Sequence, residues 1–153
     1  MDKKKLLDKI GQKIIRVLQD DARLSFAEVG KIVGLSPPAV IERIRRMEEA
    51  GIITGYHAQI DAEATGAPVT AFVHLRCPAE KYAQIISLSR DIDAILECHH
   101  ISGDHSLILK IAVPSIPALE KVVTRLGRFG STATSLVLSS PVVKHSTGQT
   151  CED

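Results

Sequence analysis

The chain has 153 residues, of which 44% are hydrophobic and only 3% aromatic, which suits one ordinary domain or two small ones with an aliphatic core. Its formal net charge of +1 excludes a polycation, although residues 1–60 carry 11 Lys or Arg against 8 Asp or Glu, and residues 61–153 carry 8 against 10. We find neither a signal peptide nor a membrane span, and three cysteines without framework spacing favour the reducing cytoplasm.

Helical spacing dominates the first part of the chain. Apolar residues recur every three or four positions over residues 6–22, which predicts one amphipathic helix. Ser25 and Glu28 then have the spacing of a capping box, in which each side chain accepts a backbone N–H of the other residue. They predict a second, short helix, and Gly34 is placed to end it.

A third helix is predicted over residues 36–50. Ser36 is its N-cap, Pro37 occupies the first helical position, where a missing N–H does no harm, and Gly51 stops it. The alternating residues 52–61 follow with several β-branched side chains, which predict a small hairpin or wing. The order is that of a winged helix-turn-helix.

Small and turn-prone residues at 61–68 suggest a linker between a first domain of residues 1–60 and a second of residues 69–145. Beyond the linker the pattern changes to strands that alternate with helices, and residues 146–153 look like a tail. The order βαββαβ predicts a ferredoxin-like domain and an α+β fold class for the whole chain. The segments are strands 69–77, 94–102, 106–113 and 132–140 and helices 79–91 and 116–130.

Three arginines lie on the third helix. Val40, Ile44 and Met47 have the spacing of a buried stripe, and the arginines are expected away from it, with Arg45 flanking the exposed face. The planar guanidinium matches phosphate oxygens and guanine edges, and a small Ala39 allows close approach to a groove. The candidate DNA-binding residues are Ser36, Pro38, Ala39, Glu42, Arg43, Arg45 and Arg46.

A solvated amphipathic helix is the alternative for this segment, with Glu42–Arg46 and Arg45–Glu49 as ordinary ion pairs one turn apart. The preceding short helix and tight turn favour DNA binding, because a helix-turn-helix places its second helix in the major groove.

The sequence resembles a known family. "LSFAEVGKIVGLSPPAVIERIRRMEEAGIITGYHAQID" resembles the winged helix-turn-helix of the Lrp/AsnC family of bacterial and archaeal transcription regulators. "ECHHISGDHSLILKIAV" and "TATSLVL" are similar to two stretches of that family's second domain. The resemblance covers about residues 5–145, in the right order and spacing.

The second domain has features that favour self-association. Both helices of a βαββαβ unit cover the same sheet face, and the strand at residues 107–113 is apolar on both faces apart from Lys110. We therefore expect a second copy to cover the open face as a two-fold dimer, although the first domain is an alternative cover. The resemblance implies dimers that assemble further, into octamers or other rings.

The resemblance also implies a small effector, usually an amino acid, bound around the turn at residues 102–106. Gly103 permits an unusual backbone angle, and Asp104 can accept a hydrogen bond from an ammonium group. Ser106 and His105 replace an acidic and an aromatic residue common in the family, and a plain hairpin turn is the alternative. The candidate effector residues are Gly103, Asp104, His105, Ser106, Thr132 and Thr134.

We expect no metal, cofactor or enzymatic activity. Cys98 and His100 share one side of their strand while His99 points away, so no ligand set converges, and no catalytic motif is present. The predicted function is sequence-specific DNA binding that regulates transcription and responds, through oligomeric assembly, to a small effector. An oligomeric small-molecule-binding module that acts through protein partners is the alternative.

Overall fold

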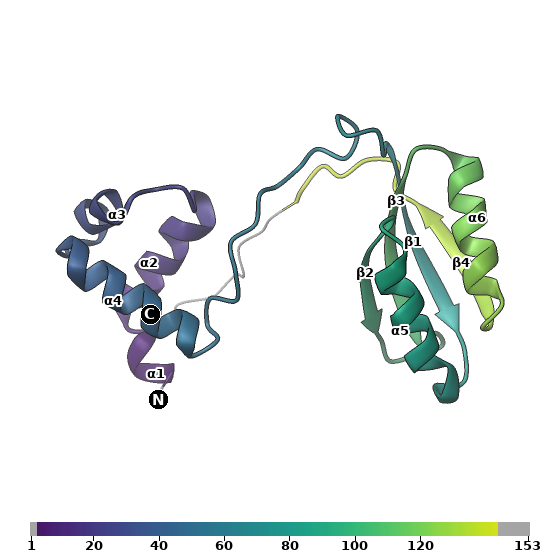
Figure 1. The fold of residues 1–153 in the computed structure, drawn as a ribbon, viewed down its shortest axis with the longest axis horizontal. Helices are drawn as coiled ribbons and strands as arrows, with labels where there is room; N and C mark the ends of the chain where they lie inside the picture. Colours follow the sequence, from purple (N-terminus) through teal and green to yellow (C-terminus); the bar gives the residue numbers. More distant parts are fainter. Residues whose placement is uncertain (1–2, 144–153) are drawn as a thin grey trace. The chain divides into compact units, whose positions relative to one another are not determined.

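The computed structural model describes residues 3–143 (Figure 1). Its contacts divide the chain into two compact units, with chain boundaries between Ala58 and Gln59 and between Pro141 and Val142, and each unit is described by itself. Across the described residues, no helix is both long enough and apolar enough to cross a membrane. The tail predicted at residues 146–153 lies outside the described residues.

The first unit is a bundle of helices. Their bounds are α1 (Lys3–Leu6), α2 (Lys9–Asp20), α3 (Phe26–Val33) and α4 (Pro37–Glu49). The core of the unit comes from all three longer helices, since Ile14 of α2, Val29 of α3 and Val40 of α4 are fully buried. Burial of these aliphatic side chains supplies the main driving force for this packing.

The first predicted helix is in fact two helices, so the prediction of a single helix over residues 6–22 is wrong. Asp8 is the N-cap of α2, and its Oδ1 accepts a hydrogen bond from the Gly11 N–H at 2.8 Å. A Cβ at Gly11 would lie 1.9 Å from the carbonyl oxygen of Leu6, so the break also depends on a glycine at this position. The apolar period runs through the break, which is why periodicity alone misses it.

The signals around α3 are confirmed. The Ser25 hydroxyl accepts a hydrogen bond from the Glu28 N–H at 3.3 Å, and the Glu28 carboxylate accepts one from the Ser25 N–H at 2.8 Å. Gly34 ends the helix with a left-handed φ of 78°. These hydrogen bonds satisfy backbone groups that a helix end would otherwise leave without partners.

The predicted hairpin or wing at residues 52–61 is not formed. Residues 54–61 have no strand assignment, and β1 (Val69–Arg76) is the first strand of the described chain. An alternating segment forms a ladder only where a second backbone pairs with it, and none of the described segments does so here. The first unit is therefore a helix-turn-helix without wing strands of its own.

A turn of helical type lies within the predicted linker. The Ala67 N–H donates to the carbonyl oxygen of Ala62 at 2.7 Å, and the Thr65 N–H donates to that of Asp61 at 3.1 Å. The Asp61 carboxylate accepts from the Glu63 N–H at 2.9 Å, which is the usual way in which Asp begins such a turn.

The second unit is a four-stranded antiparallel sheet with two helices. The strand order is β2-β3-β1-β4, the order of a ferredoxin-like βαββαβ domain, which confirms the predicted fold class. A short 3₁₀ turn, η1 (Ala79–Lys81), precedes the first helix. The remaining elements are α5 (Tyr82–Asp91), β2 (Ile95–His100), β3 (Leu107–Val113), α6 (Ile116–Gly127) and β4 (Ser131–Leu136).

One face of the sheet forms the core with both helices. Leu75 of β1, Leu109 of β3, Ile85 of α5 and Leu126 of α6 are fully buried in one cluster. Because side chains alternate along a strand, the residues of β1 and β3 that lie between the core residues, such as Phe72 and Ile108, point to the opposite face. Figure 1 shows α5 and α6 beside the sheet.

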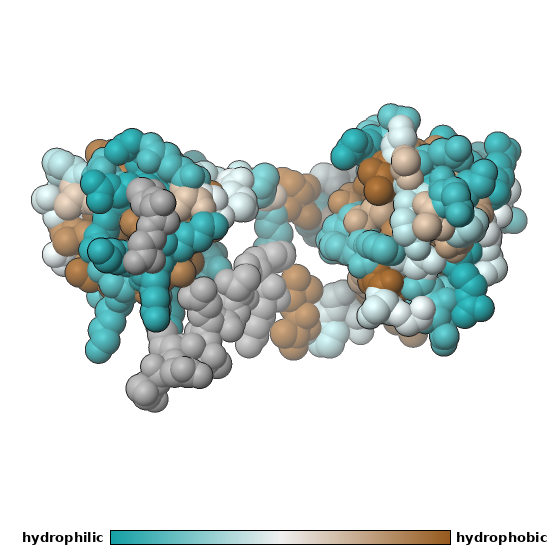
Figure 2. All heavy atoms as spheres, turned by 90° about the horizontal axis from the view of Figure 1, so that it is seen from below, coloured by the Kyte–Doolittle hydropathy of each residue, from teal (hydrophilic) through white to brown (hydrophobic). Residues whose placement is uncertain are grey.

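The open face of the sheet is more polar than the sequence suggested. Phe72 and Ile108 are half-buried at its centre. Polar side chains surround them, because the register places Glu97 beside Lys110 and His99 beside Ile108. On the surface that is visible in Figure 2, both units carry apolar patches separated by hydrophilic side chains.

Candidate DNA-binding and effector surfaces

A tight turn sets the position of α4 against α3. The Leu35 N–H donates to the carbonyl oxygen of Gly30 at 3.0 Å. A Cβ at Gly30 would lie 2.5 Å from the carbonyl oxygen of Leu35, so the turn requires a residue without a side chain there. Ser36 occupies the N-cap position of α4 as predicted, but its side chain makes no capping hydrogen bond.

The buried stripe of α4 is confirmed, since Val40 and Met47 are fully buried and Ile44 is 3% exposed. With about 100° of rotation per residue, the direction opposite this stripe falls between Pro38 and Arg46. Both of those residues are exposed, and Ala39 is half-buried at the edge of the face. The face opposite the buried stripe, called the α4 face below, consists of Pro38, Glu42, Arg45, Arg46 and Glu49.

Arg43 does not lie on the α4 face, which corrects its predicted position. Its guanidinium forms two parallel hydrogen bonds with the Asp8 carboxylate, at 2.8 and 2.9 Å, and the two side chains are 29% and 43% exposed. Position 43 follows position 40 by 300°, so it borders the buried stripe. Hydrogen bonds from Arg43 and from the Gly11 N–H hold the pKa of Asp8 below its ordinary value.

Arg45 and Arg46 point outward but are paired with carboxylates of their own helix. Arg45 binds Glu42 at 2.9 Å and also Glu49, and the Arg46 Nε lies 2.7 Å from Glu42. Hydrogen bonds from Arg45 and then from Arg46 lower the pKa of Glu42. Both pairs foreseen in the alternative interpretation, Glu42–Arg46 and Arg45–Glu49, are therefore present.

These pairs do not prevent DNA contact. Arg45 and Arg46 are 54% and 53% exposed, and Glu42 is 44% exposed. Ion pairs in contact with water contribute little, because solvent and salt screen them. A phosphate or a guanine edge can replace Glu42 as the partner of either guanidinium at small cost, so the α4 face remains suited to an anionic ligand.

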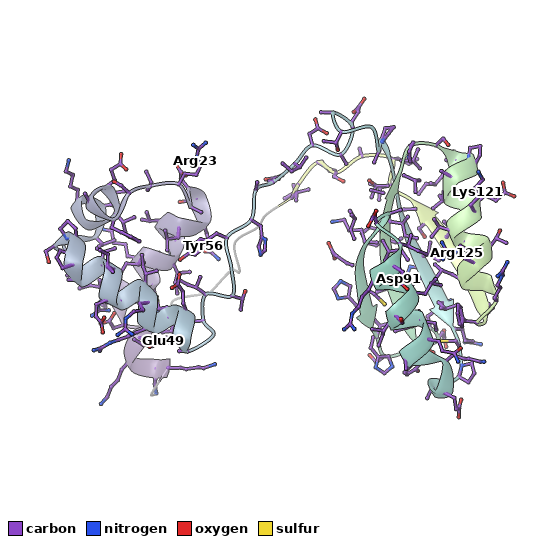
Figure 3. All side chains as sticks on the ribbon, in the orientation of Figure 1. Arg23, Glu49, Tyr56, Asp91, Lys121 and Arg125 are labelled. Carbon is purple, nitrogen blue, oxygen red and sulfur yellow. The ribbon has the colours of Figure 1, made fainter. Side chains whose placement is uncertain are left out.

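A side-chain contact links the end of α4 to the segment that follows. The Tyr56 hydroxyl donates to the Glu48 carboxylate at 2.8 Å. Burial, and then this hydrogen bond, raise the pKa of Tyr56 to about 12. Figure 3 shows Glu49 at the end of α4 and Tyr56 on the segment beyond it. Nothing local in the sequence indicates this contact.

In the second unit, the turn predicted to bind an effector is held against the end of β1. Gly103 has a φ of 110°, an angle that favours glycine, as predicted. The Arg76 Nε donates to the carbonyl oxygen of Asp104 at 2.6 Å. The Ser106 hydroxyl donates to the carbonyl oxygen of Cys77 at 3.0 Å and accepts from its N–H at 3.4 Å, so it already has partners.

The sheet separates the other candidate effector residues. The His105 ring lies against the His74 ring in a tilted arrangement, with ring centroids 5.3 Å apart, and His74 belongs to the open face. Thr132 lies opposite Leu75 and Thr134 opposite Val73, so both threonines point to the helix side. The turn and the two threonines therefore do not converge within one unit.

A shallow cleft of about 630 Å³ lies between α5 and β2, where the sequence indicated no site. Ile86, Arg90, Asp93 and Leu96 are among the residues that line it, and none of the candidate effector residues does. No cluster of three or more metal-binding side chains occurs anywhere in residues 3–143.

In comparisons with known proteins, each of the two units matches a known domain. The model of the AsnC-type helix-turn-helix domain matches residues 7–48. The model of the Lrp/AsnC ligand binding domain matches residues 70–147, about half of the chain. The two matches follow one another in the same order as the two units.

Individual relatives agree with these matches. The HTH-type transcriptional regulator LrpC of Bacillus subtilis is 33% identical over 142 residues, which are 93% of this chain and 99% of the relative. Its solved structure has a TM-score of 0.85 and covers 90% of this chain and 99% of its own. The leucine-responsive regulatory protein of Klebsiella pneumoniae is 38% identical over 120 residues, 76% of this chain and 73% of the relative.

A transcriptional regulator of Neisseria meningitidis, solved as a complex with L-methionine, has a TM-score of 0.86 at 26% identity and covers 92% of this chain and 96% of its own. The helix-turn-helix, the βαββαβ sheet and these relatives together show that the chain belongs to the Lrp/AsnC family of DNA-binding transcriptional regulators and is not an enzyme.

Proposed function

We propose that the chain recognises specific DNA sequences through the α4 face and that a small effector, an amino acid, changes its assembly and its DNA binding. The observation that supports this most directly is the exposed pair Arg45 and Arg46 on the second helix of a helix-turn-helix. The complete set of residues proposed for DNA binding, by contact or by positioning, remains Ser36, Pro38, Ala39, Glu42, Arg43, Arg45 and Arg46. Arg43 is included as the residue that ties α4 to Asp8.

Substitution of the exposed arginines tests this role. An Arg45→Ala/Arg46→Ala variant is expected to lose at least tenfold in affinity for a specific site, measured by fluorescence anisotropy, because two charge-assisted contacts are removed. Arg125→Ala/Arg128→Ala, which removes two exposed arginines of the second unit, is the matched control (Figure 3 labels Arg125). Unchanged affinity in the double variant contradicts the role of the α4 face and favours a module that acts through protein partners.

The effector proposal rests on the turn at residues 102–106 and on the relative solved with L-methionine. We infer that Gly103 presents backbone N–H groups to a carboxylate, that Asp104 receives the ammonium group, and that His105, Ser106, Thr132 and Thr134 belong to the same site. Since the threonines lie on the other side of the sheet, a second subunit is needed to complete it. Titration calorimetry with L-methionine and other amino acids tests binding, and Asp104→Asn is expected to weaken it.

We further propose that the open face of the sheet binds a second copy of the chain. Phe72 and Ile108 at its centre are apolar, and the helices leave this face uncovered within the unit. Light scattering is expected to give at least twice the monomer mass and a mass that changes with the effector, whereas Ile108→Glu is expected to give monomers. A monomer mass for the unaltered chain at all concentrations contradicts the proposal.

The arrangement of the chain follows from these roles. We propose that residues 1–60 bind DNA, that residues 61–68 link the domains, and that residues 69–145 assemble and bind the effector. Limited proteolysis is expected to cut first within residues 52–68, between the two compact units. A regulator of transcription in this family works where the chromosome is, so we place the chain in the cytoplasm.

A further inference from the structure

The helix α4, whose exposed face is proposed to read DNA, carries no net charge. Residues 37–49 hold three arginines against three glutamates, which gives zero. Residues 3–16 hold six Lys or Arg against Asp8 alone, which gives +5, and residues 17–36 hold two against three, which gives −1. The positive surplus of the first unit therefore lies entirely in α1 and the first part of α2.

The segment that carries this positive charge lies beside α4. Asp8, at the start of α2, binds Arg43 of α4 at 2.8 Å, and a Cβ at Gly11 would lie 3.0 Å from the terminal methyl of Met47. The second half of α4 thus packs against the segment that holds the lysines. Lys3, Lys4, Lys5 and Lys9, called the lysine cluster below, are all exposed.

Three members of the lysine cluster, Lys3, Lys5 and Lys9, differ from the α4 arginines in their partners. Arg45 and Arg46 are each bound to a carboxylate one turn away. Within residues 3–143, by contrast, no carboxylate lies within ion-pair distance of Lys3, Lys5 or Lys9. These three ammonium groups are solvated cations, which gain by meeting a polyanion because they release its condensed counterions.

We propose that the lysine cluster binds the phosphate backbone of DNA beside the groove that α4 enters, and supplies most of the affinity that does not depend on sequence. This inference rests on the proposed DNA-binding function and divides the work within it: α4 distinguishes bases, and the cluster provides the electrostatic attraction. The cluster comes from α1 and from the first residue of α2, on either side of the break at Asp8, so its ammonium groups can contact separate phosphates.

DNA fits the lysine cluster better than a membrane surface does. Binding to a lipid interface requires apolar side chains beside the cations. The apolar residue of α1, Leu6, is only 8% exposed and packs inward, so it is not available for insertion into a bilayer. A regular line of phosphates is the anionic ligand that remains.

The test is the salt dependence of DNA binding by the full chain. Lys3→Gln/Lys5→Gln/Lys9→Gln removes three charges and keeps good helix formers, while Lys121→Gln/Arg125→Gln/Arg128→Gln removes three exposed charges of the second unit as a matched control. Each lost phosphate contact lowers the slope of log K against log salt by about 0.9, so the first variant is expected to lose about 2.7. Its ratio of specific to non-specific affinity should stay within about twofold of the unaltered chain.

Each outcome decides between the two claims. If the unaltered chain has a steep salt slope that the lysine variant retains, or if the control loses as much slope as the lysine variant, the inference is overturned and the proposed function stands. If the unaltered chain shows no salt-dependent DNA binding, the proposed function fails. Lys3→Arg/Lys5→Arg/Lys9→Arg keeps the charges and is expected to restore the slope, which separates charge from any loss of helix structure.

Discussion

Asp8 offers a sharp test of how the first unit is held together, because one carboxylate has two separate partners. Its Oδ1 caps α2 through the Gly11 N–H at 2.8 Å, and both of its oxygens bind Arg43 of α4. Asp8→Asn keeps an acceptor for the cap and removes the negative charge. Asp8→Ala removes both interactions, so the difference between the two variants isolates the cap.

The structure sets the expected magnitudes. Loss of an N-cap side chain costs about 1 kcal/mol of unfolding free energy. The ion pair is 29% and 43% exposed on its two sides, so water screens it and it contributes at most about 1 kcal/mol. We therefore expect Asp8→Asn to lose about 0.5–1 kcal/mol and Asp8→Ala about 1.5–2 kcal/mol.

Hydrogen exchange with mass spectrometry across a urea titration, read on peptides from α2 and α4, measures this local stability without averaging over the second unit. In a double-mutant cycle that combines Asp8→Asn with Arg43→Gln, the coupling energy should account for most of the unfolding free energy that Asp8→Asn loses. Equal losses in the two Asp8 variants, or a coupling energy of zero against Arg43→Gln, would refute the account.

The same carboxylate gives the sign of a pH effect. Its pKa is lower in the folded chain than in the unfolded chain, where its ordinary value is 3.8, chiefly because of the hydrogen bonds from Arg43. Its stabilisation is therefore complete above that ordinary value and is lost as the pH falls through the folded value. The Asp8→Asn variant should lack this part of the acid sensitivity, and an acid dependence identical to that of the unaltered chain would show that Asp8 does not contribute it.

Two further predictions follow from single sites. Gly30→Ala should destabilise the first unit by about 2 kcal/mol or more, since its Cβ would meet the Leu35 carbonyl oxygen at 2.5 Å. Gly127→Ala, with open space around it, should be neutral or stabilising by up to about 1 kcal/mol. Urea titration measures both effects, and equal stability of the two variants would rule out the close approach at Gly30. Tyr56 should ionise near its raised pKa of about 12, so Tyr56→Phe should remove a part of the absorbance change at about 295 nm that occurs above pH 11. Loss of a part that occurs only near the ordinary tyrosine value of about 10 would contradict the contact with Glu48.

Local signals allowed most elements to be predicted from the sequence. The capping box of Ser25 and Glu28 and the glycine at position 34 act within a few residues, so the two ends of α3 can be predicted from the sequence alone. The strands of the second unit were likewise predicted within two residues of their observed ends, except that the last strand ends at Leu136, four residues before the predicted residue 140. The family resemblance rested on these same stretches.

The features that were missed depend on partners far away in the sequence. The break at Asp8 is stabilised by Arg43, 35 residues on, and the apolar stripe, which runs through the break, gives no warning of it. Residues 54–61 alternate as a strand does but have no second backbone to pair with among the described residues. Alternation shows that a segment can be a strand, whereas a ladder requires a partner.

In the candidate sites, too, features set by nearby residues were predicted, and features set by distant residues were missed. The buried stripe of α4 was predicted correctly, but Arg43 and Arg45 exchanged places relative to the prediction, because small errors of helical angle decide which side chain borders the core. For the effector residues, the strand register places His105 and Thr134 on opposite sides of the sheet. Register cannot be read from a single strand, so their separation was not foreseeable.

The most direct test of the central claim, that the α4 face reads DNA sequence, is selection of binding sites from a random DNA library by the full chain and by Arg45→Ala. We predict that the unaltered chain enriches a motif with two related halves, and that the variant still binds but loses preference at one or two positions in each half. Enrichment of the same motif by both proteins, or of none by the unaltered chain, would contradict it.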